Sequence, residues 1–378
     1  MEQIEKFLQQ QEQRQLLRGL CPADARGDGK IYFNGKEYID FSSNDYLGLS
    51  NHPKIKQAVL KAVDKFGGSS SASRLLSGDL KLHHQLEEQT ADFKGKEAAL
   101  IFNSGYQANV GVISALYQKG DVIFSDKLNH ASIVDGIGLS GARFFRFLHN
   151  DITHLKTLLK KERNKFKNAL IITETIFSMD GDRAPVTDIV RLKEKYHCQI
   201  FVDEAHATGI FGKNGAGVVE EEGMTGDIDI IMGTFSKALG SFGAYVAVSN
   251  KIKKYLINTC RSFIYSTALP PAVISANLES INLIKQEPQR RKILLKNAGF
   301  FRTMLQHKGV SITGGSQIVP LILRENIKAM EYSKKLKDAG YWVVAIRPPT
   351  VPEGAARIRF SLTYNHTKEM LEKVACCI

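Results

Sequence analysis

Short apolar runs alternate with amphipathic helical stretches over half of this chain, and this pattern limits the possible folds more than any other feature. The helical stretches between the runs are roughly ten to fifteen residues long, which indicates βαβ units around a mostly parallel sheet. The runs lie at 97–102, 121–125, 144–148, 168–175, 199–205, 227–233 and 244–249. In sheets of this kind, sites gather at the carboxyl ends of the strands.

The last third of the chain predicts a smaller α+β unit. A helical stretch at 272–308, broken at Pro288, leads into it, and a helix is expected from Ile327 to Ala339. The β-rich runs here lie at 310–314, 318–324, 341–346 and 355–363. We therefore expect an α/β fold with an N-terminal arm over residues 1–46, a large domain over 47–285 and a small C-terminal domain over 286–378.

Composition places the chain among soluble globular proteins. Its 378 residues are 43% hydrophobic and 24% charged, and the apolar runs are too short to span a membrane. The first twenty residues predict an amphipathic helix with three glutamates and no secretory signal. The five cysteines form no CxxC pair, which suits a reducing compartment. We expect a cytoplasmic protein with no membrane partner and no metal site.

The chain is basic, with 51 Lys and Arg residues against 39 Asp and Glu residues and a net charge of +12. Such an excess suits nucleic acid, an acidic substrate or an acidic carrier protein, and it also favours solubility. The basic residues are spread along the whole sequence rather than clustered. We therefore expect no nucleic-acid partner.

Two short motifs resemble nucleotide-binding motifs, but each lacks the sequence context that nucleotide binding requires. Residues 203–206 spell Asp-Glu-Ala-His, as in helicases, but no Gly-Lys pair is followed by the Ser or Thr of a phosphate-binding loop. The glycines of 136–141 fit a dinucleotide-binding spacing, but they lie in a helical pattern and not between a strand and a helix. We interpret those glycines as packing or capping residues.

A lysine and an aspartate at the ends of two predicted strands point to a definite chemistry. Asp203 ends one apolar run, and Lys237 follows another within a segment rich in glycine and hydroxyl groups. A buried Lys–Asp pair could be a structural ion pair. Pyridoxal phosphate enzymes require the same two groups, a lysine for the Schiff base and an acid that faces the pyridine nitrogen. A desolvated lysine is also a nucleophilic, basic amine.

A phosphate-binding site is predicted beside them. The Ser-Gly step within 103–111 opens a helix, whose free N–H groups and dipole favour an anion, although a plain N-cap explains the same residues. Thr234 and Ser236 add hydroxyl groups next to the lysine, and His130, just before another helix, offers a ring partner.

Five segments together resemble the α-oxoamine synthases, which are pyridoxal phosphate enzymes of aminotransferase fold type I. These segments are FSSNDYLGLSNHP (41–53), NHASIVDGI (129–137), FSMDGDRAP (177–185), FVDEAHATGIFG (201–212) and TFSKALGSFGAY (234–245). They occur in family order, and the resemblance covers nearly the whole chain. It implies an acyltransferase that joins an amino acid to an acyl thioester with loss of CO₂.

Within that family, residues 149–155 and 346–363 are most similar to the biotin-pathway members. Those members condense L-alanine with pimeloyl-CoA or a pimeloyl acyl carrier protein. A member that joins glycine to acetyl-CoA is the nearest alternative. A non-catalytic partner subunit is a remote one, because such subunits lack the lysine that is present here.

The resemblance also implies roles for individual residues around the cofactor. Lys237 would carry pyridoxal phosphate and later remove the α-proton, Asp203 would face the pyridine nitrogen, and His130 would stack on the ring. The remaining cofactor-binding residues would be Ser178 and His206 at the phenolic oxygen, Gly105, Tyr106 and Thr234 at the phosphate, and Ser266 and Thr267 at the neighbouring subunit's phosphate.

These last two residues imply a homodimer with shared active sites, although an N-cap before Pro270 would explain them equally well. Arg359 would hold the substrate carboxylate with assistance from Asn44, since a guanidinium binds a carboxylate through two parallel hydrogen bonds. Thr350 and Arg18 would meet the acyl substrate.

Overall fold

The chain divides into two compact units in a computed structural model that describes residues 1–378. The large unit comprises Leu49–Phe177 and Arg183–Arg291, and the small unit comprises Met1–Gly48, Ser178–Asp182 and Lys292–Ile378. The sequence-based boundaries treated each domain as one continuous segment. In the structure, the five residues Ser178–Asp182 group with the two ends of the chain.

A seven-stranded sheet forms the centre of the large unit, in the order β4-β10-β9-β8-β7-β5-β6. Its strands are β4 (Ala98–Phe102), β5 (Val122–Asp126), β6 (Arg143–Phe147), β7 (Ala169–Glu174), β8 (Gln199–Asp203), β9 (Ile230–Thr234) and β10 (Ala244–Val248). Only β10 runs antiparallel to its neighbours. The predicted mostly parallel sheet is confirmed.

Burial on both faces explains why these strands are continuous apolar runs. Every residue of β4, β5, β7, β9 and β10 is buried, whereas the edge strand β6 is largely exposed. A core cluster joins strand residues such as Leu170 and Phe201 to Val112 and Ile133 on covering helices. Those covering helices are α4 (Gly105–Leu116), α5 (Ala131–Ser140), α9 (Asn250–Thr259) and α10 (Arg261–Ile264).

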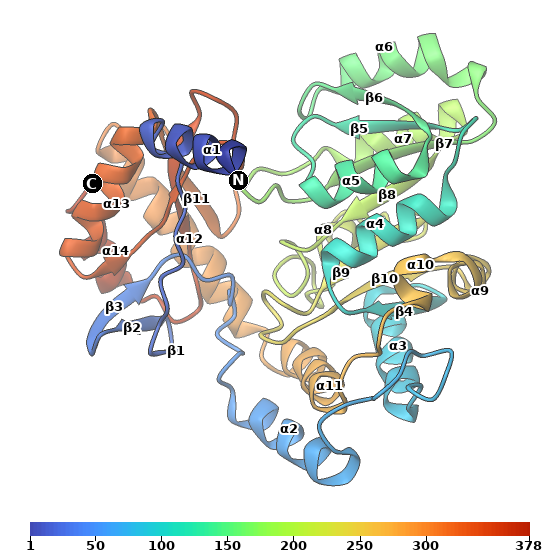
Figure 1. Ribbon diagram of the computed structural model, residues 1–378, viewed down its shortest axis with the longest axis horizontal. Coiled ribbons are helices and arrows are strands. Elements are labelled where there is room, and N and C mark those ends of the chain that lie inside the picture. Colours follow the sequence, from blue (N-terminus) through green and yellow to red (C-terminus); the bar gives the residue numbers. More distant parts are fainter. The chain divides into compact units, whose positions relative to one another are not determined.

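The other helices of the large unit complete its layers (Figure 1). They are α2 (Pro53–Phe66), α3 (Lys81–Lys94), α6 (Ile152–Glu162), α7 (Val186–Tyr196), α8 (Val218–Glu221) and α11 (Pro271–Gln286). Helix α11 packs against α2 and α3. The glycines of 136–141 lie in α5 and at its left-handed C-cap, Gly141, so their interpretation as packing or capping residues is confirmed.

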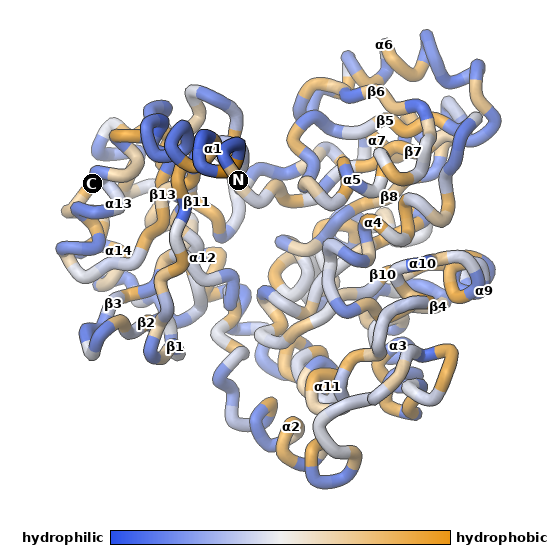
Figure 2. Tube along the Cα trace, in the orientation of Figure 1, coloured by the Kyte–Doolittle hydropathy of each residue, from blue (hydrophilic) through white to orange (hydrophobic).

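The small unit contains two sheets and most of the remaining helices. One sheet has the order β1-β2-β3-β12 and the other β11-β14-β13. Its elements are α1 (Glu2–Gln13), β1 (Ala25–Gly27), β2 (Lys30–Phe33), β3 (Lys36–Asp40), most of α12 (Gln289–His307), β11 (Ile318–Arg324), α13 (Asn326–Asp338), β12 (Tyr341–Trp342), β13 (Ala345–Ile346), β14 (Ala356–Ser361) and α14 (Lys368–Ala375). Helix α1 buries no residue and is mostly hydrophilic in Figure 2. No helix of the chain combines the length and the apolar character that crossing a bilayer requires.

One strand expected in this unit is absent, and three strands near the N-terminus were not predicted. Residues 310–314 form no strand. The N-terminal segment expected as an arm contains the three strands β1, β2 and β3, joined by tight turns at Asp28-Gly29 and Asn34-Gly35, where all four residues have positive φ. Asp-Gly and Asn-Gly are the residue pairs that two-residue hairpins prefer, so the signal was present in the sequence.

Candidate active site

Three neighbouring strands of the large sheet end in polar side chains that are buried. Glu174 ends β7, Asp203 ends β8 and Thr234 ends β9, and each is no more than 5% exposed. Because these strands are parallel and adjacent, their last residues meet at one edge of the sheet. This edge is where the fold predicts a site.

A cavity of about 190 Å³ opens at that edge. Its lining consists of Gly105, Tyr106, Asn109, His130, Ser132, Glu174, Asp203, Ala205, His206, Met232, Thr234, Ser236 and Lys237. Seven residues predicted from the sequence therefore meet at one place: Gly105, Tyr106, His130, Asp203, His206, Thr234 and Lys237.

Asp203 is held by neutral donors. Its Oδ2 accepts a hydrogen bond from Asn109 Nδ2 at 3.0 Å, and its Oδ1 accepts one from the backbone N–H of Ala205 at 2.8 Å. The Asn109 amide also donates to Ser132 Oγ at 2.9 Å, which ties helices α4 and α5 to the strand end. These bonds orient the carboxylate without neutralising it, so it can still receive a cationic group from the cavity.

Lys237 lies in the loop between β9 and β10. Thr234 Oγ1 and Ser236 Oγ both donate to the carbonyl oxygen of Gly243, at 2.8 and 3.2 Å, and so close the base of this loop. Gly243 itself has φ +100°, which a residue with a Cβ rarely adopts. The amine Nζ is 3.0 Å from His206 Nε2. Thr234, Ser236 and Gly243 thus fix the shape of the loop, and this shape places the Lys237 amine against the imidazole of His206.

His130 caps helix α5. Its Nδ1 accepts from the backbone N–H of Ser132 at 3.2 Å and is 2.7 Å from Ser132 Oγ. Burial lowers the pKa of the His130 imidazole, although the nearby charge of Asp203 acts in the opposite direction. A neutral ring is therefore favoured, with its Nδ1 lone pair occupied by the helix start.

Glycine and tyrosine open helix α4 as predicted. Ser104 is the N-cap, and its Oγ accepts from the N–H of Gln107 at 3.2 Å. The N–H groups of Gly105 and Tyr106, two residues that line the cavity, have no partner within the helix. The hydroxyl of Tyr106 donates to Asp135. An N-cap is present, and the cavity beside it provides a place for an anion.

Ser266 and Thr267 do not line this cavity. Gln107 donates to Ser266 Oγ, and Asn103 Nδ2 donates to the carbonyl of Thr267 at 2.9 Å. Thr267 also forms an isolated β-bridge with Ser73. Ser266 and Thr267 therefore lie in a surface loop of the large unit that is hydrogen-bonded to residues at the start of α4.

Arg359, Asn44 and Ser178 come together in the small unit. The Arg359 guanidinium donates to the Ser178 carbonyl at 2.5 Å, to Asn44 Oδ1 at 3.3 Å and to Tyr46 Oη at 3.0 Å. The side chain is 7% exposed, and no acidic group pairs with it. A buried permanent cation without a counter-ion is suited to bind an anion.

Arg357, two residues earlier on β14, differs. Its Nη1 pairs with Asp180 Oδ1 at 2.5 Å and donates to the carbonyl of Met179 at 3.2 Å. Residues two positions apart on a strand face the same side, so the sequence pattern alone does not distinguish Arg357 from Arg359. The ion pair makes Arg357 the structural member and leaves Arg359 with its charge uncompensated.

Arg18 and Thr350 are also neighbours in the small unit. Arg18 Nη2 donates to Thr350 Oγ1 at 3.0 Å and to the carbonyl of Pro348 at 3.3 Å. The two residues predicted to meet the acyl substrate are 332 positions apart in the chain and form one exposed polar contact.

Three polar residues of the site escaped the sequence analysis: Asn109, Ser132 and Glu174. Glu174 ends an apolar strand in the same way as Asp203, so the rule that identified one carboxylate could have identified the other. Asn109 and Ser132 lie inside helices, where an isolated polar residue gives no comparable signal.

The whole chain is similar to known enzymes. Residues 36–378 match the family model of class I and II aminotransferases. An 8-amino-7-oxononanoate synthase from Geobacter sulfurreducens is 46% identical over 98% of this chain and 95% of its own length. Another from Geotalea daltonii is 44% identical over 96% of this chain and 93% of its own.

Solved structures agree with this assignment. A serine palmitoyltransferase from S. paucimobilis with bound PLP and myriocin has a TM-score of 0.93 at 31% identity, over 99% of this chain and 96% of that one. An 8-amino-7-oxononanoate synthase from Francisella tularensis has a TM-score of 0.79 at 31% identity, over 90% and 96%. With nearly full-length coverage on both measures, this chain belongs to the class I and II aminotransferases, in their α-oxoamine synthase branch.

Proposed function

We propose that this chain condenses L-alanine with a pimeloyl thioester of CoA or an acyl carrier protein. The products are 8-amino-7-oxononanoate, CO₂ and free thiol, in biotin biosynthesis. The chain is an acyltransferase, and relatives at about 45% identity over nearly its full length carry the name of this activity. The observation that carries the proposal is the cavity in which Lys237, Asp203, His130 and His206 meet.

Pyridoxal phosphate is the cofactor, and the groups around the cavity fit it. Asp203 offers an uncompensated carboxylate to a pyridinium nitrogen, Lys237 offers an amine, and the start of α4 offers N–H groups to a phosphate. The neutral imidazole of His130 offers a flat surface. When bound, the cofactor supplies an electron sink for negative charge at the α-carbon of the amino acid.

The residues of the chain then perform the proton chemistry. Lys237 takes the proton from Cα of alanine and later returns one to Cα of the product, with His206 hydrogen-bonded to its amine. Asp203 holds the proton of the pyridine nitrogen by its charge. His130 donates a hydrogen bond from Nε2 toward the acyl carbonyl, because its Nδ1 is occupied by Ser132.

Arg359 binds the alanine carboxylate, with Asn44 setting the orientation of the guanidinium. This carboxylate leaves as CO₂ after the new carbon–carbon bond forms and the thiol departs. Arg18 and Thr350 hold the acyl substrate through their exposed contact. The proposal assigns Gly105, Tyr106 and Thr234 to the phosphate, and Ser178 and His206 to the phenolic oxygen.

The proposed active unit is a homodimer with shared sites. Ser266 and Thr267 would reach the phosphate of the neighbouring subunit, which is consistent with their place in a surface loop away from the cavity of their own chain. We propose the cytoplasm as the location, since all five cysteines are free thiols, as expected in a reducing compartment.

A thiol-release assay that crosses amino acids with thioesters tests the substrates. Alanine, glycine and serine are each combined with pimeloyl, acetyl and palmitoyl thioesters of CoA and of acyl carrier protein. We expect the alanine–pimeloyl pair to give the highest kcat/KM, with 8-amino-7-oxononanoate as the product by mass spectrometry. A preference for glycine with acetyl-CoA, or for serine with the palmitoyl thioester, would replace the proposal by one of those two activities.

A chemical trap tests the assignment of the lysine independently of the substrates. Borohydride reduction of the protein with pyridoxal phosphate, followed by peptide mass mapping, should leave the pyridoxyl group on Lys237. A tag on another peptide would contradict the site.

A further inference from the structure

Glu174 and Asp203 form a pair of carboxyl groups side by side in the cavity. They are register partners on the adjacent parallel strands β7 and β8, so their Cα atoms are about 5 Å apart and their side chains point to the same face. Both line the cavity, and Glu174 is 3% exposed. The proposed reaction gives no role to Glu174.

Two ionised carboxylates that are buried in the same cavity repel each other. In buried carboxyl pairs of this kind, one group keeps a proton. No lysine or arginine forms an ion pair with Glu174, in contrast to Glu87 and Glu204, which are equally buried but paired with Arg74 and Lys94. Burial raises the pKa of the Glu174 carboxyl well above its usual value, and the nearby charge of Asp203 raises it further. The charge of Lys237 and the hydrogen bond from the His130 N–H act in the opposite direction without reversing this rise.

The hydrogen bonds indicate which of the two groups keeps the proton. Asp203 accepts from two donors, the amide of Asn109 and the N–H of Ala205, and each stabilises its ionised form. Glu174 accepts from one donor, the backbone N–H of His130 at 2.7 Å. The second oxygen of Glu174 is therefore the better place for a proton.

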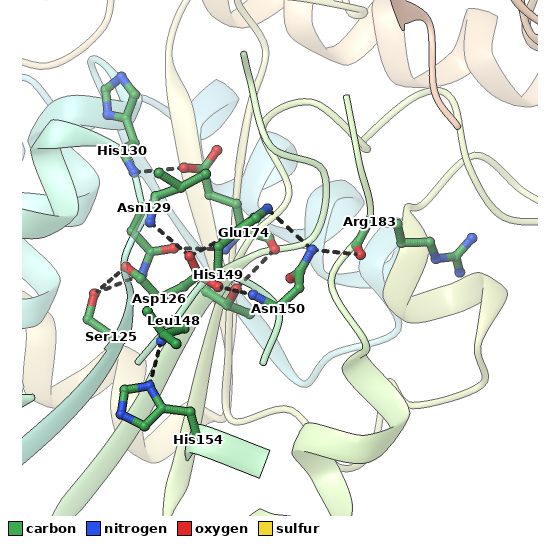
Figure 3. Close-up of polar contacts among 12 residues, drawn as sticks. Ser125, Asp126, Asn129, His130, Leu148, His149, Asn150, His154, Glu174 and Arg183 are labelled. Atoms are coloured by element: carbon green, nitrogen blue, oxygen red, sulfur yellow. Dashed lines mark hydrogen bonds and ion pairs between the residues drawn. The ribbon is translucent and has the colours of Figure 1, made fainter. Parts of the chain in front are cut away.

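Hydrogen bonds hold both the backbone and the side chain of Glu174 (Figure 3). Its backbone N–H donates to Asn129 Oδ1 at 3.2 Å, and the Asn129 amide donates to Ser125 Oγ and to the carbonyl of Ile172, both at 2.9 Å. Its side chain accepts from the N–H of His130, drawn as a dashed line in Figure 3. The backbone of Glu174 is thus tied through Asn129 to Ser125 of β5, and its carboxyl is tied to His130, the N-cap of α5.

We infer that Glu174 is an uncharged carboxylic acid in the resting site, which fixes the backbone of His130 and presents an O–H donor to the cavity. It is a positioning residue: through His130 it sets the place of the imidazole. As a neutral acid, it also limits the cavity to one carboxylate, that of Asp203, so that a dianionic phosphate ligand meets less repulsion.

Infrared difference spectroscopy tests the protonation state directly. In the full-length protein, with and without pyridoxal phosphate, Glu174→Gln should remove the carbonyl band of a protonated carboxylic acid that shifts in D₂O. Labelling with ¹³C-glutamate should shift the same band in the wild type, which assigns it to a glutamate without any variant. Glu162→Gln, which removes an ion-paired glutamate, is the matched control and should leave the band intact. A wild-type spectrum without such a band would overturn the inference.

The affinity for pyridoxal phosphate separates charge from geometry. Glu174→Gln keeps the length of the side chain, its neutral state and an oxygen that can accept from the His130 N–H. Glu174→Asp keeps an ionisable carboxyl group on a shorter side chain. We expect the aspartate variant to bind the cofactor about 5- to 10-fold more weakly than the glutamine variant, because it withdraws from the His130 N–H. The reverse order would show that ionisation matters and would refute a neutral Glu174. Neither readout involves alanine or a thioester, so an error in the proposed substrates leaves this test unaffected.

Discussion

The carboxyl edge of the large sheet and strand β14 of the small unit both bury charged groups, but in opposite ways. At the sheet edge, Lys237 lies against an imidazole and Asp203 beside a second carboxyl group, so protons can be exchanged within the cluster. On β14, Arg357 and Arg359 are permanent cations that cannot take part in proton transfer. The first region is suited to moving protons and the second to binding a fixed anion.

The two arginines of strand β14 also differ from each other in how their charges are balanced. Arg357 is neutralised by Asp180, while Arg359, equally buried, faces only neutral acceptors. A buried charge without a partner is unfavourable for folding, and such a group is expected where a ligand supplies the counter-charge. A difference of two positions in sequence thus separates an ion-paired arginine from a buried arginine without a counter-ion, which we propose as a binding residue.

Replacing the lysine should have the largest effect. Lys237→Ala removes the group proposed to take the Cα proton, so kcat should fall by ~10⁴-fold or more. The absorption band of the bound cofactor should shift in the visible spectrum, which a spectrophotometric titration with pyridoxal phosphate records. Lys251→Ala, at an exposed lysine of α9, is the control and should behave like the wild type. Turnover by the alanine variant would refute the proton-transfer role of the region.

Alanine substitution on β14 should separate the two arginines. Arg359→Ala should raise the KM for alanine by roughly 100-fold and change the KM for the thioester little, because a charge-assisted bidentate contact is lost. Arg357→Ala should leave the KM for alanine near the wild-type value and lower the free energy of unfolding by about 2 kcal/mol, through the lost ion pair.

Steady-state kinetics and chemical denaturation of both variants measure these effects. Equal changes in KM for the two substrates in Arg359→Ala would contradict the carboxylate clamp. A high KM for alanine in Arg357→Ala would contradict the distinction between the arginines.

The pH dependence of stability should distinguish Glu174 from an ordinary carboxylate. Because the pKa of Glu174 is raised in the folded state, the folded protein binds more protons than the unfolded chain above pH about 4.5. Stability is then lost as the pH rises, by at most about 1.4 kcal/mol per pH unit, up to the folded-state pKa. Denaturation of the cofactor-free protein at a series of pH values should show Glu174→Gln gaining stability over the wild type as the pH increases. A constant difference between the two would contradict the raised pKa.

The sequence predicted the large sheet and the cavity better than it predicted the small unit. Five of the seven predicted residues that line the cavity stand at the end of an apolar strand or the start of a helix, positions that a linear pattern marks directly. The other two, His206 and Lys237, lie in the loops that follow β8 and β9. The proposed strand at 310–314 is wrong, and β1 to β3 were missed even though Asp28-Gly29 and Asn34-Gly35 mark their turns. Strands β1 to β3 are mostly exposed or half-buried, so they lack the continuous apolar runs that mark the strands of the large sheet.

Contacts between residues far apart in the chain could not be predicted from the sequence, for a different reason. The distinction between Arg357 and Arg359 depends on Asp180, and the state of Glu174 depends on Asp203 in the neighbouring strand. Each relation is set by tertiary register and burial rather than by local pattern. Spacing can place a charged residue on a face, but only the fold gives its partner.

The smallest effect is expected at the contact between Arg18 and Thr350, which tests how far the proposed anion binding by the small unit extends. Thr350→Val removes the hydroxyl that accepts from Arg18 at 3.0 Å, at an exposed position. An exposed neutral acceptor contributes about 1 kcal/mol, so the KM for the pimeloyl thioester should rise only about 3- to 5-fold while the KM for alanine stays constant. Thr350→Ser retains the hydroxyl and should recover most of the loss. If serine were as impaired as valine, or if the alanine KM changed as well, then this contact would serve the packing of the small unit and Arg359 would be its only anion-binding arginine.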